Sequence, residues 1–177
     1  MIVSFIIVAY NASKTLHTIL NDLILQDYEL SKIEVILIDG NSEDNTKKIM
    51  LDFCKKNNLF NRIIVLDNPQ RTLPCGWNIA LKAAKGDIYL RVDAHASIPT
   101  NFISKNVETI ISGQEICGGK VISITDDITP WKITLAHAEN SMFGGSVAQF
   151  RRLEIKKYVN TLAFAAYKKD VFEKVGY

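Results

Sequence analysis

Four apolar runs, separated by segments of helical periodicity, dominate the first hundred residues. The runs read "IVSFIIVA" at 2–9, "IEVILID" at 33–39, "RIIVLD" at 62–67 and "DIYLRVD" at 87–93. Each run is nearly continuous and rich in β-branched residues, which is typical of strands covered on both faces. After the first run, apolar residues recur at helical spacing from Leu16 to Ile24. Four strand–helix units in succession predict an α/β domain with a mostly parallel sheet flanked by helices.

The later part of the chain continues the pattern. It shows a helix over 101–112, a strand over 115–124, a helix beginning at Thr129 and Pro130, and a strand over 161–169. A length of 177 residues suffices for one domain with a substantial core.

Ser42 is expected to cap the helix after the second strand, because Glu43 and Asp44 follow it in the first turn.

Composition narrows the function classes. The formal net charge of +2, from 21 basic and 19 acidic residues, gives no reason to expect nucleic-acid binding. The three cysteines form no CxxC motif, so that no disulfide framework is expected and a reducing cytosol fits. No run approaches the ~18 apolar residues of a membrane span. We therefore expect a cytoplasmic domain, with the inner face of the cell membrane as an alternative location.

Polar residues able to bind a ligand follow all four predicted strands. They are Tyr10 and Asn11 after the first strand, Asp39 at the end of the second, Asp67, Asn68 and Arg71 after the third, and Asp93 and His95 after the fourth. Because ligands bind beyond the carboxyl ends of the strands in such sheets, we expect a site at this edge. Loops are polar in general, however, and a strand-end carboxylate beside a surface histidine is the plain alternative.

Signatures of other nucleotide-binding and hydrolytic sites are missing from these loops. The first loop reads "AYNASK", which is neither a Rossmann G-x-G-x-x-G nor the Gly-rich basic loop expected of a nucleotidyltransferase. The P-loop and the G-x-S-x-G elbow are absent. The segment "DGNSEDNT" is like a calcium loop, but it lacks Gly at position six and Glu at position twelve.

Three segments, taken together, carry a family resemblance. They read "SFIIVAYNASKTLHTILNDLILQ", "IEVILIDGNSEDNT" and "LPCGWNIALKAAKGDIYLRVDAH". In this order and spacing they resemble family 2 glycosyltransferases of the GT-A fold, and the form "RVDAHA" with "YVNTLAFAAYKKDVFEKVGY" is most similar to bacterial exopolysaccharide glucosyltransferases of the succinoglycan type. The resemblance implies a single GT-A domain over 1–177, with a nucleotide-binding half at 1–98 and the start of an acceptor half at 99–177.

The resemblance implies transfer of a sugar from a nucleoside diphosphate, expected to be UDP, to a saccharide or lipid-linked saccharide acceptor. Asp93 and His95 occupy the position of the family's D-x-D motif and would hold Mn²⁺ or Mg²⁺ against the diphosphate as a Lewis acid. In an extended stretch, residues i and i+2 point to one side, so that both side chains would face one ion. An imidazole ligand favours Mn²⁺. Arg91 lies on the same face and is a candidate partner of Asp93.

The same resemblance implies nucleotide binding by seven residues. They are Ala9, Tyr10, Asn11, Asp39, Arg71, Asn78 and Asp93. Asp39 would accept the N–H of a uracil-type base, and Tyr10 would stack on or flank that base. Arg71 would reach a phosphate.

Ordinary structural roles compete with several of these assignments. Asn11 can shape the turn after the first strand, Arg71 can be solvated, and Asn78 can pack within its helix. Trp77 is expected in the core, whereas Trp131 lies on an apolar stripe and could instead line an acceptor groove.

In the resembled family, which inverts the anomeric centre, the catalytic base follows shortly after the segment matching "VFEKVGY". We therefore expect the base beyond Tyr177, assign none here, and expect a truncated domain that turns over slowly. A non-catalytic sugar-nucleotide-binding module is the alternative. The basic run 151–157 is expected to be a solvated helix face, with a membrane surface or an anionic lipid carrier as the other possibility.

Overall fold

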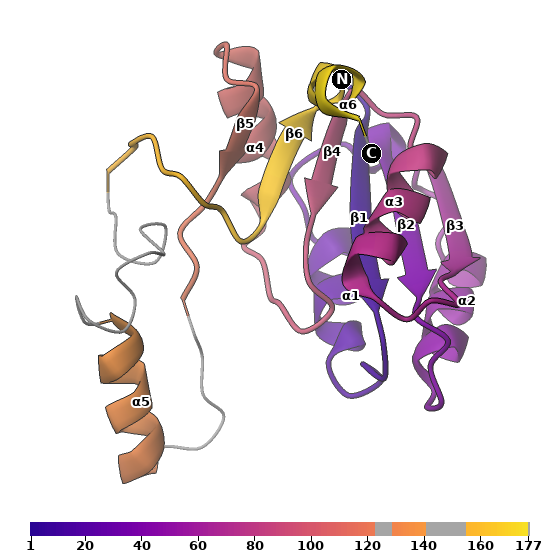
Figure 1. Ribbon diagram of the computed structural model, residues 1–177. Helices are drawn as coiled ribbons and strands as arrows, with labels where there is room; N and C mark the ends of the chain where they lie inside the picture. The colour runs from indigo at the N-terminus through magenta and orange to yellow at the C-terminus, as the bar shows by residue number, and fades with distance from the viewer. Residues whose placement is uncertain (123–128, 141–154, 177) are drawn as a thin grey trace. The chain divides into compact units, whose positions relative to one another are not determined.

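The computed structural model describes residues 1–122, 129–140 and 155–176 (Figure 1). The chain forms two compact units, one made of 1–117 with 166–177 and the other of 118–165. The strands are β1 (Val3–Ala9), β2 (Ile33–Asp39), β3 (Arg62–Asp67), β4 (Ile88–Arg91), β5 (Ile116–Gly118) and β6 (Ala165–Lys168). The helices are α1 (Leu16–Ile24), α2 (Thr46–Lys56), α3 (Leu73–Ala83), α4 (Phe102–Ile111), α5 (Pro130–Asn140) and α6 (Lys169–Val175), with a 3₁₀ turn η1 (Leu30–Lys32).

The strands form one sheet in the order β3-β2-β1-β4-β6-β5. β1 pairs in parallel with β2 and β4, β2 pairs in parallel with β3, and β6 runs antiparallel to β4. The predicted α/β class with a mostly parallel sheet is therefore confirmed. Because the parallel strands share one direction, their carboxyl ends and the loops after them gather at one edge.

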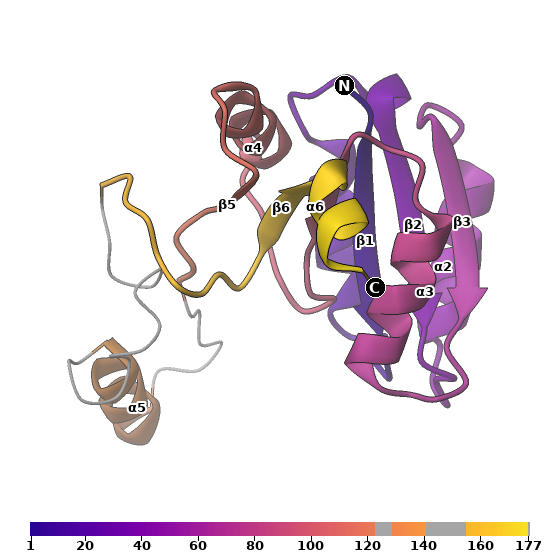
Figure 2. The ribbon, with the colours of Figure 1, turned by 45° about the horizontal axis from the view of Figure 1, so that its top comes forward.

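The two faces of the sheet are covered by different helices. Figures 1 and 2 show α3 and α6 on one face and α1 and α2 on the other. Every residue of β2 is buried, as the continuous apolar run predicts for a central parallel strand. On the α3 and α6 face, Phe172 stacks on Tyr89, and Trp77 contacts Phe172 edge-on. The expected core position of Trp77 is thus confirmed.

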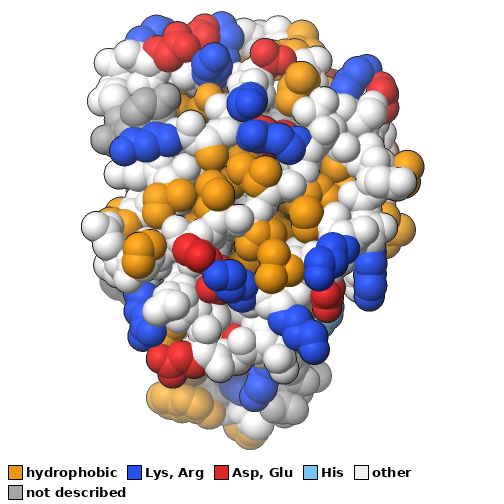
Figure 3. Space-filling model, turned by 90° about the vertical axis from the view of Figure 1, so that its right-hand side faces the viewer, with side chains coloured by type: hydrophobic (Ala, Val, Ile, Leu, Met, Phe, Trp, Pro, Cys, Tyr) orange, Lys and Arg blue, Asp and Glu red, His pale blue; other side chains and the backbone are white. Residues whose placement is uncertain are grey.

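β3 is the edge strand of the parallel part of the sheet. Five of its six residues are half-buried and the last is exposed, in contrast to β2. Figure 3 looks onto this side of the molecule and shows hydrophobic side chains among charged groups of both signs. A strand with one neighbour is covered less completely than a central one, and mixed charge on its flank discourages pairing with another strand.

The later strands are shorter than the sequence predicts. β4 ends at Arg91 rather than at 93. β5 covers only the beginning of the range 115–124, of which residues 123 and 124 lie outside the described part, and β6 covers only the second half of the range 161–169. The three cysteines are free, as expected. Within the described ranges, no helix is both long and apolar enough to cross a membrane.

The second unit carries α5. The Trp131 side chain on this helix is 70% exposed, so it does not pack in a core. The basic run 151–157 lies in this unit, and its first four residues are outside the described part of the chain, whereas Lys156 and Lys157 are exposed. The alternatives weighed for this run therefore stay open.

Candidate functional site

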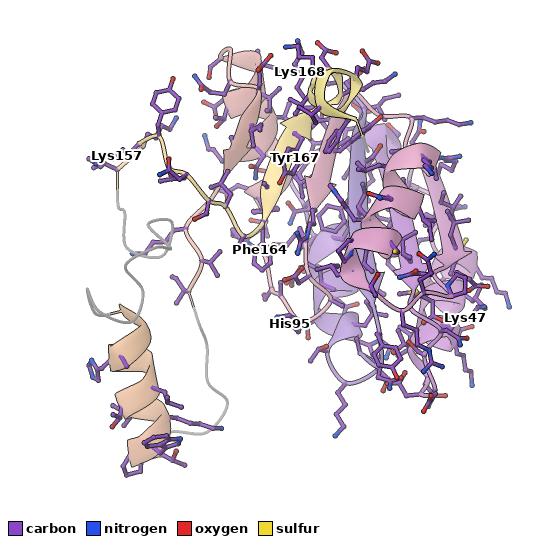
Figure 4. The ribbon with its side chains drawn as sticks, viewed as in Figure 1. Lys47, His95, Lys157, Phe164, Tyr167 and Lys168 are labelled. Atoms are coloured by element: carbon purple, nitrogen blue, oxygen red, sulfur yellow. The ribbon has the colours of Figure 1, made fainter. Side chains whose placement is uncertain are left out.

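The carboxyl ends of three strands are aligned in one row. In the sheet register, Ala9 of β1 lies beside Asp39 of β2, and Asp39 lies beside Asp67 of β3. The row continues into the loops, because Gly40 donates its N–H to the Ala9 carbonyl and Asn68 donates to the Asp39 carbonyl. The expected gathering of polar strand ends at one edge is therefore present, and Figure 4 shows Lys47 and His95 at this end of the sheet.

The loops after β1 and β2 are tied to each other by reciprocal hydrogen bonds. The Asn11 N–H donates to Ser42 Oγ at 3.0 Å, and the Glu43 N–H donates to Asn11 Oδ1 at 2.9 Å. Asn11 adopts a left-handed backbone (φ 49°), a conformation that Asn tolerates better than most residues. Asn11 thus shapes the turn, and its side-chain oxygen is engaged in holding the two loops together.

Ser42 does not cap a helix, which corrects the prediction. α2 begins four residues later, at Thr46, and the Ser42 hydroxyl serves the neighbouring loop instead. The carboxylate of Asp44 accepts hydrogen bonds from the Thr46 N–H and hydroxyl and from the Ser13 N–H. These bonds, of which the one from the Thr46 hydroxyl has the largest effect, hold the pKa of Asp44 well below its ordinary value. The segment 39–46, which is like a calcium loop, therefore holds the loop after β1 in place through hydrogen bonds.

Asp39 is a buried carboxylate with one oxygen unused. The residue is 1% exposed, and its Oδ2 accepts the Ser42 N–H at 3.1 Å. Its Oδ1 has no hydrogen-bond partner among the described residues. A buried carboxylate oxygen without a donor is costly, which favours a site where a ligand supplies an N–H or O–H.

Tyr10 and Arg71, from the loops after β1 and β3, lie against each other. The Arg71 guanidinium is 5.6 Å from the centre of the Tyr10 ring, and it also pairs with Glu43 at 3.3 Å. Tyr10 is 46% exposed, although it follows a buried strand. A cation over an exposed aromatic face is a modest attraction, so the pair can part when a ligand competes for the ring.

Asn68 is one of the polar residues expected at this edge after the third strand, and it is buried. It is 1% exposed, its Nδ2 donates to the Thr72 carbonyl at 2.8 Å, and its carbonyl accepts the Arg71 N–H. These bonds close the loop that holds Arg71 in a left-handed backbone (φ 59°). Its position directly after the third strand, before Pro69, was the available signal.

Asp93 and His95 line one pocket with Ala9 and Tyr10. The pocket measures about 210 Å³, and Val8, Ala12, Leu73 and Ala94 complete its lining. The Asp93 side chain is one-third exposed, and His95 is exposed. The structure therefore brings together the two predicted metal ligands and two of the predicted nucleotide-binding residues, in a pocket between the ends of β1 and β4.

The local backbone at Asp93 differs from the extended stretch assumed above. The strand ends at Arg91, and the Ala96 N–H donates to the Asp93 carbonyl at 3.0 Å, which closes a turn. The alternation of side chains along a strand therefore does not apply at Asp93 and His95. Both side chains nevertheless reach the pocket, because the turn carries them there.

The exit from this turn is pinned to α1. Asp22 Oδ2 accepts both the Ser97 hydroxyl at 2.7 Å and the Ile98 N–H at 2.9 Å. Buried Gln26 donates from Nε2 to the Pro99 carbonyl and accepts the Ile103 N–H at Oε1. One side chain of α1 and one that follows it two residues after its end thus replace the missing strand pairing of the segment after the turn.

We expect Gln26→Ala to lower the free energy of unfolding by about 1–3 kcal/mol, because it leaves the buried Ile103 N–H without an acceptor. It also removes one of the two hydrogen bonds at the Pro99 carbonyl, which still accepts the Phe102 N–H. Urea denaturation measures the effect. Asn21→Ala, at an exposed position of α1 five residues earlier, is the control and should change stability by no more than about 0.5 kcal/mol. An equal loss in both variants would show that Gln26 does not pin the segment.

Asn78 is not brought to the pocket. It is half-buried on α3 and does not line the pocket that Asp93 and His95 share. Glycine at position 76 explains how α3 lies so close to the site, since a Cβ there would meet Val8 Cγ1 at 2.6 Å and Asn68 Nδ2 at 3.0 Å. The role assigned to Asn78 stays a prediction.

The donor set at the pocket suits a cation that is shared with a ligand. Among the described residues, no three His, Cys, Asp or Glu side chains cluster as a complete metal site. One carboxylate and one imidazole on a half-open pocket leave most coordination positions to water and to the ligand's oxygens, as is usual for Mg²⁺ or Mn²⁺ bound with phosphates. Asp93 and His95 therefore fit such an ion in chemical type.

Comparison with known proteins places these residues in a family context. The family model described as Glycosyl transferase family 2 matches residues 4–176. A dolichyl N-acetyl-alpha-D-glucosaminyl phosphate 3-beta-D-2,3-diacetamido-2,3-dideoxy-beta-D-glucuronosyltransferase of Methanococcus voltae is 32% identical over 60% of this chain and 33% of its own length. The succinoglycan biosynthesis protein ExoA of Rhizobium meliloti is 25% identical over 80% of this chain and 42% of its own length. The chain thus spans about a third and about two fifths of these two relatives.

Solved structures share the fold. Staphylococcus aureus TarS 1–349 in complex with UDP-GlcNAc matches 99% of this chain and 47% of its own, with a TM-score of 0.72 and 23% identity. The mannosyltransferase PcManGT from Pyrobaculum calidifontis, in complex with GDP-Man and Mn²⁺, matches 98% of this chain and 46% of its own, with a TM-score of 0.67 and 20% identity. At such identities the likeness establishes the GT-A type of fold.

Proposed function

The chain belongs to glycosyltransferase family 2, and we propose that it forms the donor-binding part of an enzyme that uses UDP-sugar. The acceptor would be a saccharide or a lipid-linked saccharide, and transfer would invert the anomeric centre. Residues 1–98 would bind the nucleotide, and residues 99–177 would begin the part that meets the acceptor. The relatives' printed names include a transferase acting on a dolichyl phosphate sugar and a succinoglycan biosynthesis protein, which supports this class of acceptor.

One observation carries the proposal: the pocket between β1 and β4 joins Tyr10, Asp93 and His95 in a single space. An aromatic ring suits a nucleobase, whereas a carboxylate with an imidazole suits a cation that bridges to phosphate. A nucleoside diphosphate carries both chemical groups, which fits a pocket with the two features side by side.

The base would be recognised at Asp39. Its Oδ1 is buried and without a partner among the described residues, and it would accept the ring N–H of uracil. The residue after Asp39, Gly40, packs against Tyr10, on which the base would stack. A Cβ on Gly40 would lie 3.1 Å from Tyr10 Cβ. Arg71, which lies over Tyr10, would close over the base or contact a phosphate.

The diphosphate would lie at the Asp93 turn. A divalent cation held there would neutralise the leaving diphosphate as a Lewis acid. Asp93 and His95 would orient that end of the donor. The bond between the anomeric carbon and the diphosphate would break as the acceptor oxygen bonds to that carbon, and the acceptor hydroxyl would give its proton to a catalytic base, for which no residue is assigned. The bonds from Asp22 and Gln26 would keep the turn in place during this exchange.

The nucleotide preference tests the proposal. We expect isothermal titration of the chain with UDP, GDP, CDP and ADP, each with Mn²⁺, to give the tightest binding for UDP. A uracil presents one ring N–H between two carbonyls, which suits a single free carboxylate oxygen. Equal affinity for all four nucleotides would contradict base recognition at Asp39, and no binding to any of them would contradict the proposed function itself.

We expect Tyr10→Ala to weaken UDP binding about tenfold, because stacking of a base on an aromatic ring contributes about 1–3 kcal/mol. Tyr10→Phe keeps the ring and should bind within about twofold of the wild type. The same titration measures both variants. A Phe variant as weak as the Ala variant would assign the effect to the hydroxyl and not to stacking.

A further inference from the structure

Arg91 pairs with the Asp93 carboxylate, to which the proposed function assigns a cation. It is the last residue of β4, and its Nη2 lies 3.3 Å from Asp93 Oδ1. Both side chains are about one-third exposed, at 31% and 32%, so that water screens the pair only in part. Arg91 Nε is buried and has no hydrogen-bond partner among the described residues. The guanidinium therefore has the Asp93 carboxylate as its partner and donor capacity left over.

A guanidinium and a divalent cation compete for one carboxylate. An ion arriving at Asp93 meets a fixed positive charge two residues away, and the repulsion between the two is felt over several ångströms in a half-buried place. The pocket offers His95 as a second ligand, which carries no charge when it binds a metal, so that nothing else there offsets the arginine. Arg91 should thus weaken cation binding while the pocket holds no anion.

A diphosphate reverses this balance. Its negative charges attract the cation and the guanidinium alike, and an Arg fork binds phosphate oxygens well. With the diphosphate in place, Arg91 gains an anionic partner and Asp93 is freed for the ion. The cation and the Arg91 guanidinium, which repel each other when no anion is bound, then both stabilise the diphosphate.

We propose that Arg91 makes cation binding at Asp93 conditional on the diphosphate, so that the ion enters with the nucleotide and leaves with it. This inference rests on the proposed function. A different role for Arg91, that of fixing the Asp93 side chain in the orientation a metal requires, predicts the opposite sign: loss of the arginine would then weaken cation binding.

The test is a titration with Mn²⁺ in which electron paramagnetic resonance measures the free ion, without UDP and at saturating UDP. We expect Arg91→Gln to bind Mn²⁺ alone at least about fivefold more tightly than the wild type. UDP raises the affinity for Mn²⁺, and this increase should be smaller in Arg91→Gln by a similar factor. A factor of this size is usual for the coupling between two ligands. Metal-free UDP should bind Arg91→Gln more weakly.

Two further variants serve as matched controls. Lys32→Gln removes a positive charge at the opposite end of β2, where Lys32 pairs with Glu29, and should leave Mn²⁺ affinity unchanged. Arg91→Lys keeps the charge and should stay close to the wild type. If Arg91→Gln does not fold, as judged by its thermal transition, Arg91→Met replaces it with the same expectation.

The outcomes separate the inference from the proposed function. If the wild type binds UDP with Mn²⁺ but Arg91→Gln binds Mn²⁺ alone with unchanged or weaker affinity, the inference is overturned and the proposed function stands. If the wild type binds neither UDP nor Mn²⁺, the proposed function fails and the inference fails with it.

Discussion

Glu34→Ala is expected to lower the free energy of unfolding by about 3–5 kcal/mol, the loss typical of removing one partner from a buried ion pair. The Glu34 side chain is 2% exposed and pairs with Arg62. Its Oε2 also accepts the Ser4 hydroxyl and the Lys85 N–H at 2.9 Å. The alanine variant would leave the guanidinium without its anion and two donors without an acceptor.

This cluster lies at the end of the sheet opposite to the proposed site. Glu34 pairs in register with Ser4 and Arg62 near the beginnings of three strands. The substitution should therefore reduce stability without a direct effect on the ligand pocket. Arg62 also donates to the Ala83 carbonyl at the end of α3, so the cluster ties that helix to the sheet.

Chemical denaturation in urea measures the expected loss, which corresponds to a fall of about 10 °C in the melting temperature for a chain of this size. Glu29→Ala is the matched control, because Glu29 also forms an ion pair, with Lys32, but its side chain is more than half exposed. It should have a far smaller effect, as exposed ion pairs do. Similar losses in the two variants would rule out the buried cluster as a special source of stability.

Asp93→Asn is expected to lower the affinity for UDP in the presence of Mn²⁺ by about a hundredfold or more. Partners that merely orient metal ligands are worth about 10- to 100-fold, and a carboxylate ligand should be worth at least as much. The amide keeps the size of the side chain but removes the negative charge that a hard cation prefers. Without Mn²⁺, the affinity for UDP should not fall, because the substitution removes a negative charge beside the diphosphate and frees Arg91 from its ion pair.

Asp67→Asn makes the same chemical change at the same edge of the sheet. Asp67 ends β3, pairs with Lys47 at 2.6 Å and does not line the pocket of Asp93. Titration calorimetry with and without Mn²⁺ should therefore show the metal-dependent loss for Asp93→Asn alone. A loss of equal size in the Asp67 variant would point to the overall charge of this edge and not to a ligand at Asp93.

The strands were predictable because burial on both faces leaves a direct mark on the sequence. Two of the apolar runs, 33–39 and 62–67, coincide with β2 and β3. β4, β5 and β6, on the side of the sheet that contains the antiparallel strand, are shorter than predicted. The end of β4 could not be placed, because the bonds that turn the chain away at Asp93 come partly from α1, some seventy residues earlier.

The candidate site was predictable in position and only partly in detail. Polar residues after four parallel strands must share one edge, so the grouping of Tyr10, Asp93 and His95 follows from topology. The role of Ser42 depends on a hydrogen bond between separate loops, which no local pattern records. Asn68, by contrast, bonds to Thr72 and Arg71 within its own loop. The pairing of Arg91 with Asp93 was expected from the sequence and is present, although Asp93 lies outside the strand.

The most direct measurement is the position of manganese in crystals grown with UDP and Mn²⁺, located by its anomalous scattering. We predict a peak in contact with the Asp93 carboxylate and with the diphosphate, and the uracil ring against Tyr10. A peak bound to the nucleotide but out of reach of Asp93, or a nucleotide bound away from the pocket between β1 and β4, would contradict the account.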